Sequence, residues 1–226
     1  MPATKDGTPK YGTAQRLLDA AEQELILNEG HLEMAAVAKR AKASVGLAYH
    51  HFGSKAGLIA AIVDRFYAPL RDIALGDAIP VELEWSAREY ARMRATTDYF
   101  YDYPLATLIA GRLAREPEVL DIEKTHMDQL LELGARNIAQ GQKAGVISAA
   151  LDPAVTVAFL MGGQRRVLDQ ALLTNPRPDR EALITDIWRF TAQALQLNAH
   201  AAKAAAQLAR PKRANQNAPT GGPNGL

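Results

Sequence analysis

Residues 33–58, EMAAVAKRAKASVGLAYHHFGSKAGL, constrain the fold more than any other part of this 226-residue chain. Apolar residues spaced i, i+3, i+4 and i+7 predict one face of a short helix: Met34, Val37, Ala38 and Ala41. After a break at 42–43, the Ser44 hydroxyl can accept a bond from a backbone N–H of a second helix, over about 45–51. So short a helix needs packing partners. Two short helices joined by a tight turn favour a helix-turn-helix that reads DNA.

The same segment is locally basic, although the formal net charge of the whole chain is only +1. Between Met34 and Val63 there is no carboxylate. The cations in this stretch are Lys39, Arg40, Lys42 and Lys55. A basic surface binds phosphate through ion pairing and the release of counterions. A solvated helix face with an aromatic anchor in the core would show the same charge pattern. Charge alone therefore leaves both interpretations open.

At these residues the chain resembles the TetR family of transcriptional regulators, whose usual pattern is I-A-x-x-A-G-V-S-x-G-x-L-Y-x-H-F-x-S-K-x-x-L. The matching residues are Val37, Ala38, Ala41, Ser44, Gly46, Tyr49, His51, Phe52, Ser54, Lys55 and Leu58. So many matches at fixed spacing are far more specific than a lone helix-turn-helix. The resemblance is specific over residues 12–67, and beyond them it concerns architecture alone.

The chain departs from the family pattern in three places. Glu33 and Met34 stand where a threonine cap is usual, so we expect a weaker cap on that helix. Lys42 replaces the usual turn glycine, and a left-handed turn at a non-glycine residue costs about 1 kcal/mol. Ala48 replaces a larger apolar residue, which loosens local packing. None of these changes removes the DNA-reading surface.

The resemblance implies which residues bind DNA. The predicted set is Lys42, Ser44, Val45, Gly46, Leu47, Tyr49, His50 and Lys55. The first residues of the reading helix would face base edges, where Val45 and Leu47 offer only apolar contact, for example to thymine methyl groups. Tyr49, His50 and Lys55 would bind phosphates and fix the register.

The whole chain is expected to be all-α, because helix formers dominate and alternating runs bounded by turns are absent. With the resemblance, about nine helices are expected. They form an N-terminal three-helix DNA-binding domain and a C-terminal ligand-binding and dimerisation domain. The expected divisions are a flexible arm at 1–10, the helix-turn-helix domain at 11–56, the second domain at 57–198 and a flexible tail at 199–226. After the helix-turn-helix, helices are expected from Ser54 to Pro69 and over 82–103, 105–115, 117–144, 153–174 and 179–197.

The middle helices are expected to hold a small organic effector in a mostly apolar cavity with few polar groups. The predicted ligand-binding residues are Phe66, Trp85, Tyr99, Phe100, Tyr103, His126, Met127, Met161 and Arg165. Tyr67, Arg112 and Gln164 are further candidates. For any single residue, ordinary core packing or surface exposure is the simpler explanation. The tyrosine-rich stretch 99–103 only hints at an aromatic or amphipathic compound.

Two apolar stripes predict a homodimer through helices 153–174 and 179–197. The first stripe is Val155, Phe159, Gly162, Gly163, Val167, Leu168 and Ala171, and the second is Leu183, Ile187, Phe190 and Ala194. Small residues at its centre would let helices approach closely. Packing within one subunit is the other explanation. A dimer is favoured because two reading heads cover the paired half-sites of a near-palindromic double-stranded operator.

Several classes of protein are disfavoured. No run of about eighteen apolar residues predicts a membrane span, and residues 1–10 lack the apolar core of a secretory signal. The absence of cysteine excludes disulfide and thiolate chemistry and fits a reducing cytoplasm. No cofactor and no membrane partner are expected.

The sequence therefore predicts a ligand-responsive DNA-binding transcriptional regulator rather than an enzyme, most often a repressor in the family it resembles. One alternative is a helical small-molecule-binding protein without a role on DNA. Another is a helical-bundle metal enzyme, because Glu123-x-x-His126 matches half of a di-iron motif. The chain has no second copy of that motif, and no G-x-S-x-G, H-E-x-x-H or P-loop pattern. Retention of the purified protein on DNA separates the first alternative from the regulator.

Overall fold

A computed structural model describes residues 12–76, 79–111, 113, 117–197 and 203–204. Within these ranges the chain forms nine α-helices and no strand, so the predicted all-α class is confirmed. The predicted arm at 1–10, nearly all of the predicted tail at 199–226, and Arg112 lie outside the described residues. None of the described helices is long and apolar enough to span a membrane.

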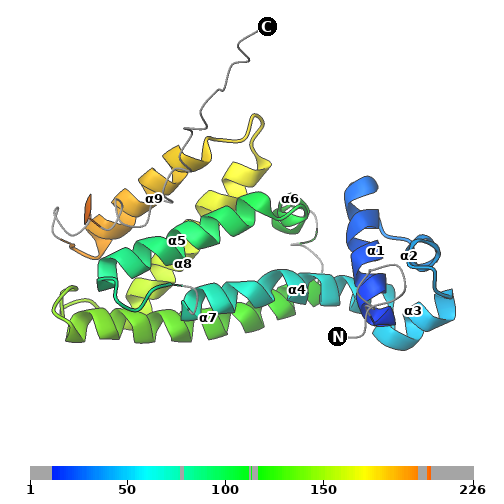
Figure 1. The fold of residues 1–226 in the computed structure, drawn as a ribbon, viewed down its shortest axis with the longest axis horizontal. Helices are drawn as coiled ribbons and strands as arrows, with labels where there is room; N and C mark the ends of the chain where they lie inside the picture. The colour runs from blue at the N-terminus through cyan, green and yellow to red at the C-terminus, as the bar shows by residue number, and fades with distance from the viewer. Residues whose placement is uncertain (1–11, 77–78, 112, 114–116, 198–202, 205–226) are drawn as a thin grey trace, which may run out of the picture.

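Helices α1 (Thr13–Leu27), α2 (Met34–Arg40) and α3 (Val45–Phe52) gather at one end of the molecule (Figure 1). Helix α3 is too short to be stable alone, and it packs on α1, α2 and α4. The shared core consists of fully buried apolar side chains: Leu17, Ala21, Leu25, Val37, Ala38, Ala48 and Leu58. We call these three helices and the packed start of α4 the head.

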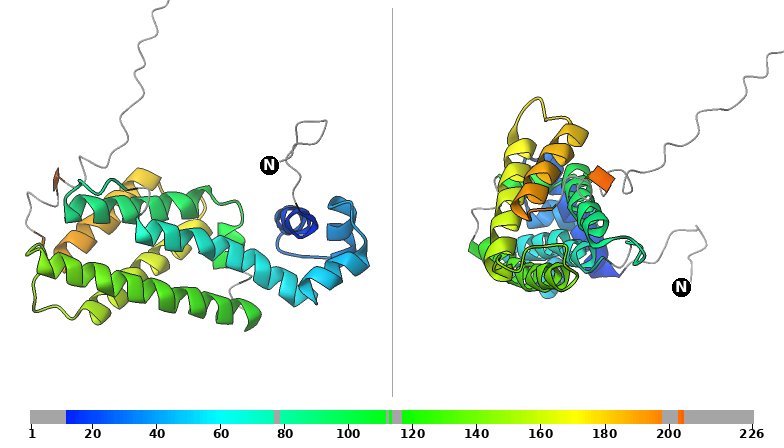
Figure 2. Two further views of the ribbon diagram at one scale, coloured as in Figure 1. Left: turned by 60° about the horizontal axis from the view of Figure 1, so that its bottom comes forward. Right: turned by 90° about the vertical axis from the view of Figure 1, so that its left-hand side faces the viewer.

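Helix α4 (Lys55–Leu75) leaves the head and continues into the C-terminal helices (Figures 1 and 2). The expectation that it ends before Pro69 is wrong, because Pro69 lies inside it. A proline there removes one helical hydrogen bond, but Phe66, Tyr67 and Leu70 are buried on either side, and their packing supports the helix. The predicted division between 56 and 57 falls in the first turn of α4. The domain division stays a prediction, and a single helix crosses it.

The C-terminal part contains α5 (Trp85–Asp102), α6 (Ala106–Ala110), α7 (Pro117–Lys143), α8 (Pro153–Leu173) and α9 (Arg180–Ala194). Helix α6 is shorter than the helix expected over 105–115. Helix α4 packs on α7, α7 packs on α8, and α5 packs on α9. One apolar cluster runs from Leu17 in α1 to Trp188 in α9. The head and the C-terminal helices therefore share a continuous core.

Four helices are capped by side-chain hydrogen bonds, and the cap predicted at Ser44 is one of them. The Ser44 hydroxyl accepts from Leu47 N at 3.1 Å, and the Ser54 hydroxyl accepts from Gly57 N at 2.9 Å. The carboxylates of Asp152 and Asp179 each accept a backbone N–H three residues on, at 2.8 Å. Each cap satisfies a backbone donor that the first helical turn leaves unpaired.

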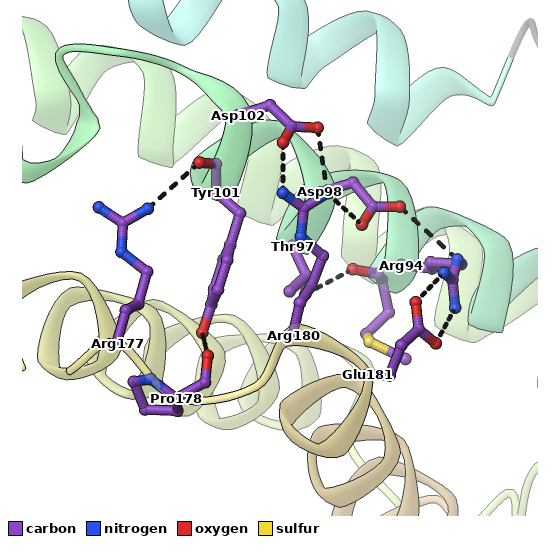
Figure 3. Close-up of polar contacts among 10 residues, drawn as sticks. Arg94, Thr97, Asp98, Tyr101, Asp102, Arg177, Pro178, Arg180 and Glu181 are labelled. Carbon is purple, nitrogen blue, oxygen red and sulfur yellow. Dashed lines mark hydrogen bonds and ion pairs between the residues drawn. The ribbon is translucent and has the colours of Figure 1, made fainter.

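Arginine–carboxylate pairs fix α9 to α5 (Figure 3). Arg180 pairs with Asp102 and, at 3.2 Å, with Asp98. Arg94 pairs with Glu181 and lies 3.6 Å from Asp98. Isolated exposed pairs contribute little to stability. Here the planar guanidinium groups each contact two carboxylates, which adds geometric specificity. The network therefore sets how α9 lies on α5.

The Arg180 pair predicts a pH-dependent stability. The hydrogen bond from Arg180 holds the pKa of Asp102 below its ordinary value of 3.8. A carboxyl group whose pKa falls on folding contributes stability above its unfolded pKa, and that stability is lost as the pH falls through the folded pKa. We expect Asp102→Asn to lower the melting temperature at neutral pH. Its difference from wild type should shrink as the pH falls below 3.8.

Thermal melts of both proteins between pH 7 and about pH 3 measure this. Asp186→Asn is the matched control, because the ion pair of Asp186 with Arg189 stays within α9. A constant difference at every pH, or equal melting temperatures at pH 7, would contradict the assignment.

Candidate nucleic-acid interface and ligand cavity

Helix α3 buries one face and exposes the other. Ala48 is fully buried against the head, while Val45 is 39% and Tyr49 47% exposed. These two residues lie one helical turn apart, so they share a face. Leu47 is half-buried, and the other seven predicted DNA-binding residues are exposed. Seven of the eight predicted residues are therefore accessible, and their contacts with DNA remain predictions.

The turn before α3 is left-handed at Lys42, whose φ is 52°. The predicted strain at this position is therefore confirmed. The weaker cap on α2 is also confirmed, because the Glu33 side chain makes no capping hydrogen bond. On the other side of α3, a Cβ at Gly57 would lie 2.1 Å from the Phe52 carbonyl oxygen. Glycine at 57 therefore allows α4 to begin close to the end of α3, which places Lys55 beside the reading helix.

The basic surface is smaller than the sequence suggested. Arg40 Nε lies 2.6 Å from Glu24 Oε1 on α1, so a carboxylate from outside the segment pairs with this cation. Lys39, Lys42 and Lys55 are exposed. The signal that was missed is Glu24, which falls on the buried face of α1. A carboxylate in such a place requires a partner.

A cavity of about 140 Å³ lies among α4, α5, α7 and α8. Its wall is largely aliphatic, with contributions such as Leu70, Met93, Leu130, Val157, Leu160 and Leu168. This volume is close to the size of cavity that holds a benzene ring. An apolar wall with a few polar groups is typical of a small-molecule site.

Four of the nine predicted ligand-binding residues line this cavity: Phe100, Met127, Met161 and Arg165. Tyr67 and Gln164 line it as well. The structure places the other five elsewhere: Phe66, Trp85, Tyr99, Tyr103 and His126. Their aromatic or polar character suggested the cavity wall, but it does not specify which neighbours each side chain reaches.

Each of the five makes specific contacts with neighbouring residues, some of which themselves line the cavity. Phe66 is fully buried among aromatic rings, and the Tyr99 hydroxyl donates to its carbonyl at 2.8 Å. The Trp85 indole N–H donates to the Asn137 carbonyl at 3.1 Å. The Tyr103 hydroxyl contacts α1. His126 Nε2 lies 2.8 Å from a carboxylate oxygen of Asp64.

Arg165 is the polar centre of one end of the cavity. Its guanidinium donates to the Tyr67 hydroxyl at 2.6 Å and to Asp169 at 2.8 Å, and it lies 3.2 Å from Glu123. Burial raises the pKa of Tyr67 well above its ordinary value, although Arg165 opposes the shift. The Tyr67 hydroxyl therefore stays protonated. Burial also raises the pKa of Asp169, again against Arg165.

A second polar group on the cavity wall was missed by sequence reasoning. Arg92 donates to Glu89 at 3.2 Å, and Asn137 donates to the same carboxylate at 2.7 Å. The available signal was the i, i+3 spacing of Glu89 and Arg92 beside the apolar residues of α5. Both arginines on the wall are thus already paired with carboxylates.

Both residues of the half di-iron motif have other partners. Glu123 pairs with Arg165, and His126 Nε2 lies within hydrogen-bond distance of Asp64. Within the residues that the structure describes, no three His, Asp or Glu side chains come together as a metal site. These contacts account for the motif without a metal.

Helices α8 and α9 expose apolar side chains. Phe159 is 77% and Phe190 64% exposed, and a Cβ at Gly163 would meet nothing within 4 Å. Part of each predicted stripe instead packs within its own subunit, because Leu168, Ala171 and Ile187 are buried. The remaining face is the kind of exposed apolar patch that marks a protein contact.

Comparison with known proteins agrees with this geometry. Residues 17–62 match the family described as bacterial regulatory proteins, tetR family. The HTH-type transcriptional regulator UidR of Escherichia coli (strain K12) is 28% identical over 163 residues, covering 68% of this chain and 79% of that protein. Salmonella enterica GusR has a similar fold, with a TM-score of 0.65, 23% identity and coverage of 84% of this chain and 98% of that chain. A SmeT–triclosan complex gives a TM-score of 0.69 at 20% identity, over 84% and 93% of the two chains. The resemblance seen at residues 33–58 is confirmed.

The strained turn predicts a stabilising substitution. Lys42→Gly removes the Cβ clash of the left-handed conformation and should raise the free energy of unfolding by about 1 kcal/mol. Denaturant unfolding measures the change. Lys42→Ala is the control, because it removes the same charge but keeps the Cβ. Equal stability of the two variants would show that the backbone at this turn is not strained.

Proposed function

We propose that this chain, which belongs to the TetR family of bacterial regulatory proteins, is a homodimeric regulator that leaves its operator when a small organic molecule enters the cavity. The observation that carries the proposal is the exposed face of α3. It is capped by Ser44, supported by buried Ala48 and flanked by exposed lysines. A DNA partner places the protein in the cytoplasm. The proposed role is regulatory rather than enzymatic.

In this proposal, the residues of the head divide into two roles. Ser44, Val45, Gly46 and Leu47 start the reading helix and approach base edges in the major groove. The group that positions the head on phosphates consists of Lys42, Tyr49, His50 and Lys55. Two heads related by two-fold symmetry would read paired half-sites of a near-palindromic operator.

The cavity between α4, α5, α7 and α8 is the proposed effector site. Its arginines already pair with Glu89, Glu123 and Asp169, so a charged ligand would have to displace an internal ion pair. Its volume of about 140 Å³ suits a single ring or a short chain. These two facts favour an uncharged molecule of that size. The triclosan complex of SmeT supports a small organic effector by analogy.

Release follows from differential binding. An effector that fits one arrangement of the two heads better than the other shifts the population toward it. If that arrangement no longer matches the half-site spacing, operator affinity falls by the ratio of the effector's affinities for the two states. As a repressor, the protein would then uncover the promoter. A helical ligand-binding protein without a role on DNA is the alternative, and the next measurement separates the two.

DNA binding is tested with an operator chosen by selection from genomic fragments. Lys55→Ala should weaken binding to all sequences similarly and reduce the slope of log affinity against log salt by about one. Tyr49→Phe should weaken binding uniformly by removing one phosphate contact. Lys124→Ala is the control, because Lys124 is an exposed lysine on α7 that pairs with Asp128. If neither head variant changes affinity or slope, these residues do not contact phosphate. A wild-type chain that retains no fragment at low salt would overturn the function.

Assembly is tested at Gly163. A Cβ there meets only open space in the single subunit, so Gly163→Arg should leave the fold intact. In a packed dimer it would introduce excess volume and an unpaired charge, costing about 3 kcal/mol or more. Light scattering should then report a monomer. Ala139→Arg, at an exposed position on α7, should stay dimeric. A wild type that is monomeric at micromolar concentration excludes the dimer.

A further inference from the structure

A direct hydrogen bond joins α1 of the head to the end of α5. The Tyr103 hydroxyl donates to Glu22 Oε1 at 2.9 Å. Glu22 also lies 3.5 Å from Arg65 Nη1 of α4, and the same Arg65 nitrogen lies 2.6 Å from Asp19 of α1. Three helices therefore meet at one polar cluster.

Local sequence explains why Tyr103 reaches α1. Pro104 follows it, and a residue before proline is disfavoured in the helical conformation. Tyr103 accordingly ends α5 in an extended conformation, with φ −77° and ψ 120°. Its side chain is only partly buried, and its hydroxyl is paired with Glu22 rather than with the cavity wall.

The ring of Tyr103 continues into an aromatic stack. Its centroid lies 5.1 Å from that of Phe66, which is fully buried on α4. Phe66 meets Phe100 edge-on, with centroids 5.3 Å apart, and Phe100 lines the cavity. The Tyr99 hydroxyl also holds Phe66, because it donates a hydrogen bond to the Phe66 carbonyl at 2.8 Å. Contacts are thus continuous from the cavity wall to Tyr103.

We propose that the hydrogen bond between Tyr103 and Glu22, here called the latch, positions the head, and that the Phe66 stack connects the latch to the cavity. The proposal rests on the proposed function for its biological meaning. Helix α4 runs from the head into the C-terminal helices and shares their apolar core. The latch adds an attachment on a second helix, α1. A molecule that displaces Phe100 then also moves Phe66 and Tyr103, and with them the orientation of α1.

A distance measurement within one subunit tests the latch without DNA. The chain has no cysteine, so Lys39→Cys in the head and Ala139→Cys in α7 create two spin-label sites, both exposed. Labelled chains are diluted with unlabelled wild type, so that a dimer carries at most one labelled subunit. Pulsed electron paramagnetic resonance then gives the head-to-body distance distribution.

The expected pattern separates a positioning role from a merely structural one. Tyr103→Phe removes the donor and Glu22→Leu the acceptor, so each should broaden or shift the distribution. The double variant should give no more change than Glu22→Leu alone, because Glu22→Leu already removes the one hydrogen bond that Tyr103→Phe removes. Glu22→Gln keeps an acceptor and should restore the wild-type distribution. Tyr101→Phe is the control, since the Tyr101 hydroxyl donates to the Pro178 carbonyl instead.

The stack is tested by Phe100→Leu, which removes the edge-on contact with Phe66 far from α1. It should change the same distance distribution. If the leucine variant does not fold, Phe100→Met is used in its place. Unchanged distances in Tyr103→Phe would overturn the latch. Unchanged distances in both Phe100 variants would overturn its connection to the cavity.

DNA binding tests whether the latch matters for operator recognition. On the selected operator, Tyr103→Phe should change affinity by about fivefold or more, with affinity for a random duplex unchanged. An unchanged operator affinity would show that the latch does not position the head for reading. If wild type binds no DNA, the proposed function fails, and the spin-label distances still decide the latch.

Discussion

The buried face of α4 is the constraint on which the rest of the structure depends. Leu58 and Ile62 complete the core beneath the reading helix, and Phe66 and Leu70 continue the same face into the C-terminal helices. Burying such side chains stabilises the fold by about 2 kcal/mol each. This packing maintains one helix through Pro69, where local preference would end it. Because the helix is continuous, it connects the head directly to the C-terminal helices.

Charged side chains have different surroundings in the C-terminal helices and in the head. In the C-terminal helices, the arginines near the cavity pair with carboxylates, as Arg165 does with Asp169. Such pairs add little net stability but fix geometry, and breaking one leaves a buried charge uncompensated. In the head, Lys39 and Lys55 are exposed to solvent, where a basic side chain is free to pair with a phosphate. The paired arginines of the cavity favour an uncharged ligand there. The exposed lysines of the head favour a polyanion as its partner.

The sequence was most informative where a local signal decides a local structure. The caps at Ser44 and Asp152, and the positive φ of Lys42, depend on residues next to them along the chain. Trp85 and Tyr99 show the limit of this reasoning. Their aromatic character predicted burial, but the partner of each polar atom is set by helix packing. Trp85 donates to Asn137, 52 residues away, and periodicity cannot predict such a pairing. Seven of the eight predicted DNA-binding residues are exposed, and all eight lie within 14 residues of sequence, at 42–55.

The conformation of Lys42 shows how the head accommodates strain. A left-handed lysine costs about 1 kcal/mol, a sizeable share of a typical domain's stability of about 5–15 kcal/mol. Glycine would remove that cost, and it would also remove an exposed cation that precedes the reading helix by three residues. The Ser44 cap and the buried Ala48 hold α3 in place despite the strained turn. A strained backbone conformation of this kind persists where the surrounding packing holds it in place. The core that α4 completes therefore also allows this head to place a lysine where glycine would relax the turn.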